Sequence, residues 1–256
     1  GAHRELEGAL EKVLELIDEP ADRVPLLAQL GTLRIAYLQD LRGGLEAYRE
    51  ALQLDPSHAT TRQSLEALLE NVEARAEAAS MLRPLYEAEG AGEKLLVVLE
   101  IQSATTEDSF ERLAVLSTAV DVAENTLGDP KRAFGFAARG LRDAATSDAI
   151  HVWLGTVERL AQAGSLVLQQ VALLREVEPE IVDEDAKLDV TLRIADLGRT
   201  TTSDRALARQ YYQRALELRG EDVRALTALE SLYDEEQDWP ALLEILKRRV
   251  EVEIEP

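Results

Sequence analysis

The sequence contains no cysteine, and only 4% of its 256 residues are aromatic. Without cysteine the chain has no disulfide, no cysteine-ligated zinc and no iron–sulfur cluster. Glycine and proline number 14 and 8, too few for a collagen-like or low-complexity chain. The longest stretch free of charged side chains, residues 160–174, is shorter than the roughly 18 apolar residues of a membrane span and contains a glycine and several glutamines. The sequence therefore predicts no membrane-spanning segment.

Basic side chains are scarce relative to acidic ones. The chain has 28 Lys and Arg residues against 49 Asp and Glu, which gives a formal net charge of −21. Such a surface repels phosphate over about a Debye length, roughly 8 Å at physiological salt. The one basic run, residues 247–249, is flanked by glutamates with which it can pair along a helix. We therefore expect an acidic, soluble protein that binds no nucleic acid and does not insert into membranes.

The first residues, Gly1-Ala2-His3, are interpreted as a cloning remnant. The helix that follows resembles the second half of a hairpin whose first half is missing. We therefore expect a fragment of a longer, cytoplasmic protein, and secretion of the full protein is left open.

Helix-forming residues dominate the composition, because Leu, Ala, Glu and Arg are abundant and apolar residues recur every 3.6 positions. No β-branched run alternates with polar residues over the length of a strand. Turn and capping residues, such as those at 55–57, 128–130 and 238–240, divide the chain into short segments. The sequence predicts an all-α protein of about fourteen antiparallel helices, near residues 4–17, 22–38, 43–53, 58–70, 72–88, 93–103, 108–127, 130–144, 148–163, 165–177, 184–199, 204–218, 222–236 and 239–252.

Internal repetition favours a solenoid over a helical bundle. Residues 32–38 recur as residues 191–197, and residues 48–54 recur with the same Tyr-x-x-Ala-Leu-x-Leu pattern as residues 212–218. A single hairpin buries too little apolar surface to fold alone, whereas stacked hairpins share one elongated core. Three capping residues mark successive copies of a larger unit, each of two repeats of roughly 34 residues: Asp40, Asp129 and Asp204.

Residues 44–56 have the clearest pattern, Gly-x-x-x-Tyr-x-x-Ala-Leu-x-Leu-Asp-Pro. This pattern resembles helix B of the tetratricopeptide repeat (TPR), with its small, aromatic, small and proline positions in order. Residues 133–140 and 208–215 fill the same small positions, and Leu154-Gly155 resembles the Leu-Gly pair of helix A. The resemblance covers nearly the whole chain, as degenerate bacterial-type repeats.

The TPR resemblance implies a right-handed α-solenoid of antiparallel hairpins. In such hairpins small residues let helices A and B approach closely, and we assign this role to Gly44, Ala51, Gly140, Gly155 and Ala215. We expect one array over residues 1–256, with units near 20–104, 105–178 and 183–256.

Side chains suited to catalysis are few. His3 lies in the cloning remnant, His58 is expected in a solvated first turn, and His151 takes the helix A position that TPRs fill with a packing tryptophan. The densest carboxylate cluster, residues 183–185 with Asp189, fits a helix start, where acidic groups meet the positive end of the helix dipole. Phosphate-binding, calcium, zinc-protease and nucleophile motifs are absent. We therefore expect no enzymatic activity, no metal and no cofactor.

By the TPR resemblance, helix A residues that are not needed for packing line a groove that binds a partner peptide, helix or domain. Arg34 and Arg193 occupy matching places in the repeated segments, where they either clamp a carboxylate or phosphate of the partner or pair with acidic helices of their own chain. Trp153 either points into the groove as a hot spot or packs, whereas Trp239 is expected to pack between helices. The candidate groove residues are Arg34, Tyr37, Asp121, Trp153, Thr156, Arg159, Arg193, Asp196, Arg224, Thr227 and Ser231.

These features favour a non-catalytic scaffold or adaptor that binds another protein, preferably a basic or amphipathic one. The alternative hypothesis is a regulatory or sensor segment of a larger enzyme, signalling protein or transcription regulator. A third hypothesis is self-association through the ends of the solenoid.

Overall fold

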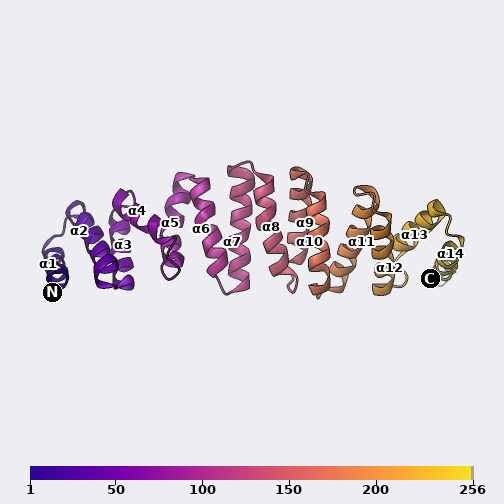
Figure 1. Ribbon diagram of the computed structural model, residues 1–256, viewed down its shortest axis with the longest axis horizontal. Helices are drawn as coiled ribbons and strands as arrows, with labels where there is room; N and C mark the ends of the chain where they lie inside the picture. The colour runs from indigo at the N-terminus through magenta and orange to yellow at the C-terminus, as the bar shows by residue number, and fades with distance from the viewer. Residues whose placement is uncertain (255–256) are drawn as a thin grey trace. The chain divides into compact units, whose positions relative to one another are not determined.

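Regular structure in the computed structural model, which describes residues 1–254, is helical throughout (Figure 1). The fourteen α-helices of this part of the chain are α1 (Ala2–Leu16), α2 (Pro20–Leu33), α3 (Leu41–Leu54), α4 (Ala59–Leu68), α5 (Arg75–Glu89), α6 (Gly92–Thr105), α7 (Ser109–Asp121), α8 (Pro130–Ala144), α9 (Ile150–Gly164), α10 (Val167–Val177), α11 (Glu184–Thr200), α12 (Arg205–Leu218), α13 (Val223–Glu236) and α14 (Trp239–Ile254).

Three short helical turns extend these helices. Two are π-helical, η1 (Arg34–Leu38) at the end of α2 and η2 (Val122–Thr126) at the end of α7, and one is a 3₁₀ turn, η3 (Glu178–Glu180), after α10. When these turns are counted with their helices, every predicted helix is present within three residues of its predicted ends. The predicted number and type of elements are therefore confirmed.

The chain divides into two units, Gly1–Gly128 and Asp129–Pro256. In the first unit α2 packs against α3, α5 against α6, and α6 against α7; in the second, α8 packs against α9, α11 against α12, and α13 against α14. Consecutive helices within each unit run in opposite directions (Figure 1). Each unit is therefore a row of helical hairpins, which confirms the predicted all-α helical-repeat class. A single array with boundaries near 104 and 178 stays a prediction.

Aspartate side chains cap the N-termini of several helices, as the sequence predicts. Asp40 accepts a hydrogen bond from the backbone N–H of Gly43 at 2.9 Å, and Asp204 accepts one from Leu207 at 2.9 Å. Asp129 caps α8 by accepting from the backbone N–H groups of Lys131 and Arg132. Each carboxylate satisfies an N–H group that has no partner within its helix, and its charge meets the positive helix end.

Close packing in the hairpins depends on small residues. A Cβ atom on Gly44 would lie 2.3 Å from a side-chain carbon of Ile35, and one on Gly140 would lie 2.2 Å from the ring of Trp153. Ala51 and Ala215 are fully buried. These four assignments are confirmed, whereas Gly155 is wrong, because it is exposed and a Cβ atom there would meet nothing within 4 Å.

Gly31 is a further glycine with this role that the sequence analysis missed. A Cβ atom on Gly31 would lie 2.5 Å from the Tyr48 ring and 3.0 Å from the carbonyl oxygen of Gly44. The thirteen-residue spacing from Gly31 to Gly44 was the available signal, and Leu30-Gly31 is a Leu-Gly pair of the kind that was assigned to Leu154-Gly155.

Among the described residues, none of the helices is both long and apolar enough to cross a bilayer.

Candidate partner-binding groove

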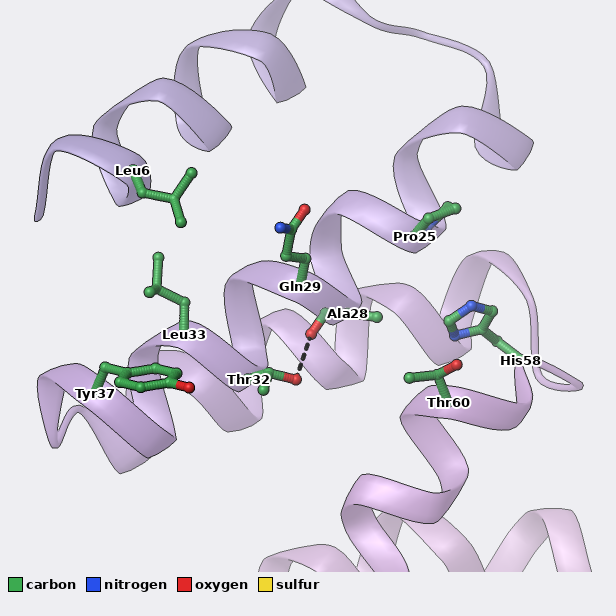
Figure 2. A pocket seen from close by; sticks show the side chains of 9 residues that line it. All are labelled: Leu6, Pro25, Ala28, Gln29, Thr32, Leu33, Tyr37, His58 and Thr60. Carbon is green, nitrogen blue, oxygen red and sulfur yellow. Dashed lines mark hydrogen bonds between the residues drawn. The ribbon is translucent and has the colours of Figure 1, made fainter. Parts of the chain in front are cut away.

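An open, mainly apolar pocket of about 380 Å³ lies in the first unit (Figure 2). One side is formed by α1, the floor by α2 and η1, and the far side by the start of α4. We call it the α1/α2/α4 groove, and its lining residues are Leu6, Pro25, Ala28, Gln29, Thr32, Leu33, Tyr37, His58 and Thr60.

Two large apolar side chains remain accessible at one end of this groove. Tyr37 is 61% exposed and Leu6 is 42% exposed. In Figure 2, Leu6 of α1 and Leu33 of α2 point toward one another across the opening, and Tyr37 lies below them. An apolar surface that is hollowed and left in water is typical of a site that another molecule covers.

The polar groups on the floor are already satisfied within the chain. The Thr32 hydroxyl donates to the carbonyl oxygen of Ala28 at 3.0 Å, the contact drawn in Figure 2, and it also lies 3.0 Å from the Tyr48 hydroxyl. Thr32 therefore presents its methyl-bearing side chain to the groove without a buried group in need of a partner. Gln29 and Thr60 are exposed and remain available for hydrogen bonds to a ligand.

His58 occupies the other end of the groove, where a short turn positions it. The Ser57 backbone N–H and hydroxyl donate to Asp55 at 2.9 and 2.6 Å, and these hydrogen bonds lower the pKa of the Asp55 carboxyl. The His58 ring then caps α4, because its Nδ1 accepts from the backbone N–H of Thr61 at 3.4 Å. His58 is half-buried, so the prediction of a solvated first-turn residue is wrong and the histidine is a helix cap.

Tyr37 is held at the groove mouth by an aromatic contact. Its ring stacks on the ring of His3, with centroids 4.5 Å apart and planes 19° from parallel. Tyr37 belongs to η1, a π-helical turn, which changes the angular position of the residues after Leu33 relative to a regular α-helix. Tyr37 is the one sequence-predicted candidate among the residues that line this groove.

Arg34 forms its ion pairs within its own chain. Its guanidinium pairs with Glu7 at 2.9 Å and with Glu11 at 2.5 Å, both on α1, and also donates to the carbonyl oxygen of Gly43. Arg193 likewise pairs with Asp189 at 2.8 Å and with Glu158. Of the two interpretations of this pair, the structure therefore shows ion pairing within the chain.

Arg34 and Arg193 are also not equivalent in the fold. The Tyr48 hydroxyl contacts Thr32, and the Tyr212 hydroxyl contacts Asp196, so in both hairpins the contact joins residues sixteen positions apart. By this register Arg34 corresponds to position 198, whereas the sequence repeat aligns it with Arg193. Matching places in the repeated segments are therefore not matching places in the two hairpins, because Asp204 follows residue 197 by seven positions whereas Asp40 follows residue 38 by two.

The two tryptophans differ in burial. Trp153 is buried and its ring lies over Gly140, so of its two interpretations the structure shows packing and not a groove position. His151, assigned to that packing position, is exposed, which shows that the alignment of α9 was two residues out of register. Trp239 is 59% exposed, so its expected role as a buried anchor between helices is also wrong.

The other candidates lie far from the α1/α2/α4 groove in sequence. Asp196 accepts from the Tyr212 hydroxyl at 2.5 Å and pairs with Arg224 at 3.4 Å. Burial and the hydrogen bond to Asp196 raise the pKa of Tyr212 above its ordinary value. Asp121 accepts from Asn125, Thr156 donates to the carbonyl oxygen of Val152, and Ser231 accepts from Arg199; Arg159 and Thr227 are exposed. A partner contact for these residues stays a prediction.

Charged clusters elsewhere are paired within the chain. In the first unit Glu66 accepts from both Lys94 and Tyr86 at 2.7 Å, and these contacts lower the pKa of Glu66, with Lys94 contributing most. In the second unit Glu178 is almost fully buried and is held by Arg214 through two contacts of 2.9 Å. No group of three histidine or acidic side chains in residues 1–254 is arranged to hold a metal ion.

Comparison with known proteins does not assign a family. No family model matches the chain, and no curated protein matches it. Similar solved structures include BtubC (BKLC) from P. vanneervenii, which is 14% identical with a TM-score of 0.40 and is aligned over 82% of this chain and 91% of its own. Human IFIT1, solved as a dimer with m7Gppp-AAAA, is 14% identical with a TM-score of 0.32, over 98% of this chain and 67% of its own. At these identities and scores, neither structure assigns an activity or a partner to this chain.

Proposed function

We propose that this chain is a non-catalytic, TPR-like interaction module whose α1/α2/α4 groove receives an apolar side chain of a partner protein. The observation that carries the proposal is the open apolar hollow with Leu6 and Tyr37 accessible at its mouth. Its volume falls within the roughly 300–1,000 Å³ of ordinary ligand sites. Residues with acid–base or nucleophilic potential do not converge in it, since His58 caps a helix there without an acidic partner in the lining.

The charge of the chain indicates the kind of partner. A protein with a formal charge of −21 attracts basic segments over several ångströms and repels acidic ones. The groove itself supplies apolar contact, and Gln29 and Thr60 supply neutral hydrogen-bonding groups. A basic amphipathic helix, with apolar residues on one face and lysine or arginine on the other, satisfies both requirements.

The proposal is tested with a defined probe. A fluorescently labelled peptide of leucine and lysine, about 15 residues long with leucines at helical i, i+3 and i+4 spacing, is titrated with the protein and followed by anisotropy. A peptide of the same composition with scrambled order is the control for charge alone. We expect the amphipathic peptide to bind at least about 10-fold more tightly than the scrambled one, and the affinity to fall as salt is raised.

Variants then locate the binding site. In the double variant Leu6→Ser/Tyr37→Ser, two exposed apolar walls are removed without a change in charge, and we expect a loss of affinity of about 10-fold or more. Val152→Ser removes an exposed apolar side chain from α9 in the second unit and should leave the affinity within about twofold. Equal binding of the two peptides, or equal binding by the Leu6→Ser/Tyr37→Ser protein and the unchanged protein, would contradict the proposal.

A further inference from the structure

The last helix, α14, carries an exposed apolar stripe. Trp239, Leu243, Leu246 and Val250 are between 38% and 59% exposed. They are spaced by four, three and four residues, so they lie along one face of the helix. We call these four residues the α14 stripe. A continuous apolar face of this length is unusual on a helix surface that remains exposed to water.

Contacts with α13 fix which face of α14 is turned outward. Ile245 is buried, and it lies on the face of α14 away from the stripe. Arg249 forms an ion pair with Glu230 of α13, and Arg248 donates to the carbonyl oxygen of Gly220 at 3.3 Å. Within the second unit α14 packs chiefly on α13. Rotation of α14 to hide the stripe would therefore break these contacts.

The spacing of the α14 stripe is the same when it is read in either direction. If a second copy of α14 lies antiparallel against the first, Trp239 faces Val250 of the second copy and Leu243 faces its Leu246. The two-fold axis then passes between positions 244 and 245, and each contact occurs twice. This is the geometry of an isologous interface, the commonest type in protein dimers.

The charges beside the stripe have the same symmetry. Lys247 is exposed beside the stripe, and Glu244, one turn before it on the same side of α14, is exposed at the edge of the hollow between α12, α13 and α14. In an antiparallel pair like flanks meet, as they do in antiparallel coiled coils, so Glu244 of each copy lies beside Lys247 of the other. Two Glu–Lys ion pairs thus border the apolar contact. A parallel arrangement lacks this matching.

We propose that the protein forms a two-fold homodimer in which the α14 stripes of two copies pack antiparallel. One helix pair buries less than the roughly 800 Å² per partner of a standard interface, so the dissociation constant is expected in the micromolar range. The competing arrangement is end-to-end stacking on α1, whose Val13 and Leu16 are also exposed. Such a heterologous contact does not close and produces chains that grow with concentration.

Sedimentation velocity over about 1 to 200 µM protein distinguishes these arrangements. We expect the mass to rise with concentration and to stop at that of a dimer. Leu243→Glu should raise the dissociation constant at least about 10-fold, because it places a charge in each half of the apolar contact. Val182→Glu, which places a glutamate at an exposed apolar position elsewhere in the second unit, should leave the dissociation constant unchanged. A monomer throughout the range, or growth past the dimer that Val13→Glu abolishes, would overturn the proposal.

Charge reversal provides a test that does not depend on apolar substitutions being tolerated. Glu244→Lys and Lys247→Glu each place like charges opposite one another and should weaken the dimer several-fold. The double variant Glu244→Lys/Lys247→Glu exchanges the two charges, which restores opposite pairs, so its dissociation constant should return to that of the unchanged protein. If the double variant were as weak as the single ones, the antiparallel register would be wrong.

Discussion

The hydroxyl of Tyr212 lies 2.5 Å from a carboxylate oxygen of Asp196, and it joins the two helices of the α11–α12 hairpin. Tyr48 makes the corresponding contact with Thr32 in the α2–α3 hairpin at 3.0 Å. In both hairpins a tyrosine of the second helix thus contacts a residue of the first helix sixteen positions earlier, although the polar residue that it meets differs. This contact, rather than the repeated segment at 32–38 and 191–197, defines the register of the hairpins.

The first prediction concerns the strength of these two contacts. Tyr212→Phe removes a hydrogen bond to a charged acceptor, which contributes about 1.5–3 kcal/mol when buried. Asp196 is half-exposed, so solvent screening reduces this, and we expect a loss of about 1 kcal/mol in the free energy of unfolding. Tyr48→Phe removes a neutral hydrogen bond and should cost about 0.5 kcal/mol. Urea unfolding followed by circular dichroism measures both, and a larger loss for Tyr48→Phe would contradict the assignment.

The second prediction is an acid sensitivity of the first unit. Contacts with Lys94 and Tyr86 lower the pKa of Glu66 below its ordinary value of 4.5. The folded state therefore favours the carboxylate, and the stability that this provides is present above pH 4.5 and is lost as the pH falls through the lower, folded-state pKa. Protection factors of the α4 to α6 amides, in which each exchange rate is compared with the intrinsic rate at the same pH, should fall as the pH decreases through this window. In Glu66→Gln the protection factors should depend less on pH; an unchanged pH dependence would argue against it.

The third prediction concerns the buried carboxylate in the second unit. Glu178 is 2% exposed and is neutralised by Arg214. Arg214→Met leaves the carboxylate buried without its partner, and because Arg214 itself is partly exposed we expect a loss of about 2–4 kcal/mol. Arg219→Met removes an arginine from the exposed pair with Asp185 and should cost less than about 0.5 kcal/mol. Similar losses in urea unfolding for the two variants would refute the distinction.

The sequence predicted the helices because their signals are local. Apolar periodicity and the aspartate caps depend on residues within one or two turns of each other, and all of the predicted helices are present. The site was harder to predict because its residues come from three helices. Leu6 and His58 reach the groove only through the packing of α1 and α4 beside α2, and no repeated segment encodes that contact.

Arg34 shows why the repeat misled the choice of candidates. Its identity is shared with Arg193, yet its partners Glu7 and Glu11 lie on α1, which has no counterpart in the repeated segment. A salt-bridge partner on another helix cannot be identified from spacing along one helix. Pro25, Gln29 and Thr32 do follow a helical spacing of four and three residues, which was a usable signal for one face of α2.

The last prediction contrasts two glycines of the second unit that the sequence treats alike. Gly155 lies inside α9 and faces open space, so Gly155→Ala should stabilise by about 0.5–1 kcal/mol through the lower conformational entropy of alanine in the unfolded chain. Gly140 lies under the Trp153 ring, where an added Cβ atom would be 2.2 Å from ring carbons. Gly140→Ala must displace a buried tryptophan, and the overpacking should outweigh the helix gain, for a net loss of about 1–2 kcal/mol.

Trp153 itself can report on this contrast. In a Trp239→Phe background Trp153 is the one remaining tryptophan of the sequence, so its fluorescence follows the packing at Gly140. Gly140→Ala should shift the emission of the native protein toward that of exposed indole, whereas Gly155→Ala should leave the emission unchanged and raise the urea midpoint. Because the two substitutions add the same methyl group to neighbouring helices, opposite signs in unfolding free energy can arise only from what each Cβ atom meets. Equal effects would mean that helices α8 and α9 do not pack through the Gly140–Trp153 contact.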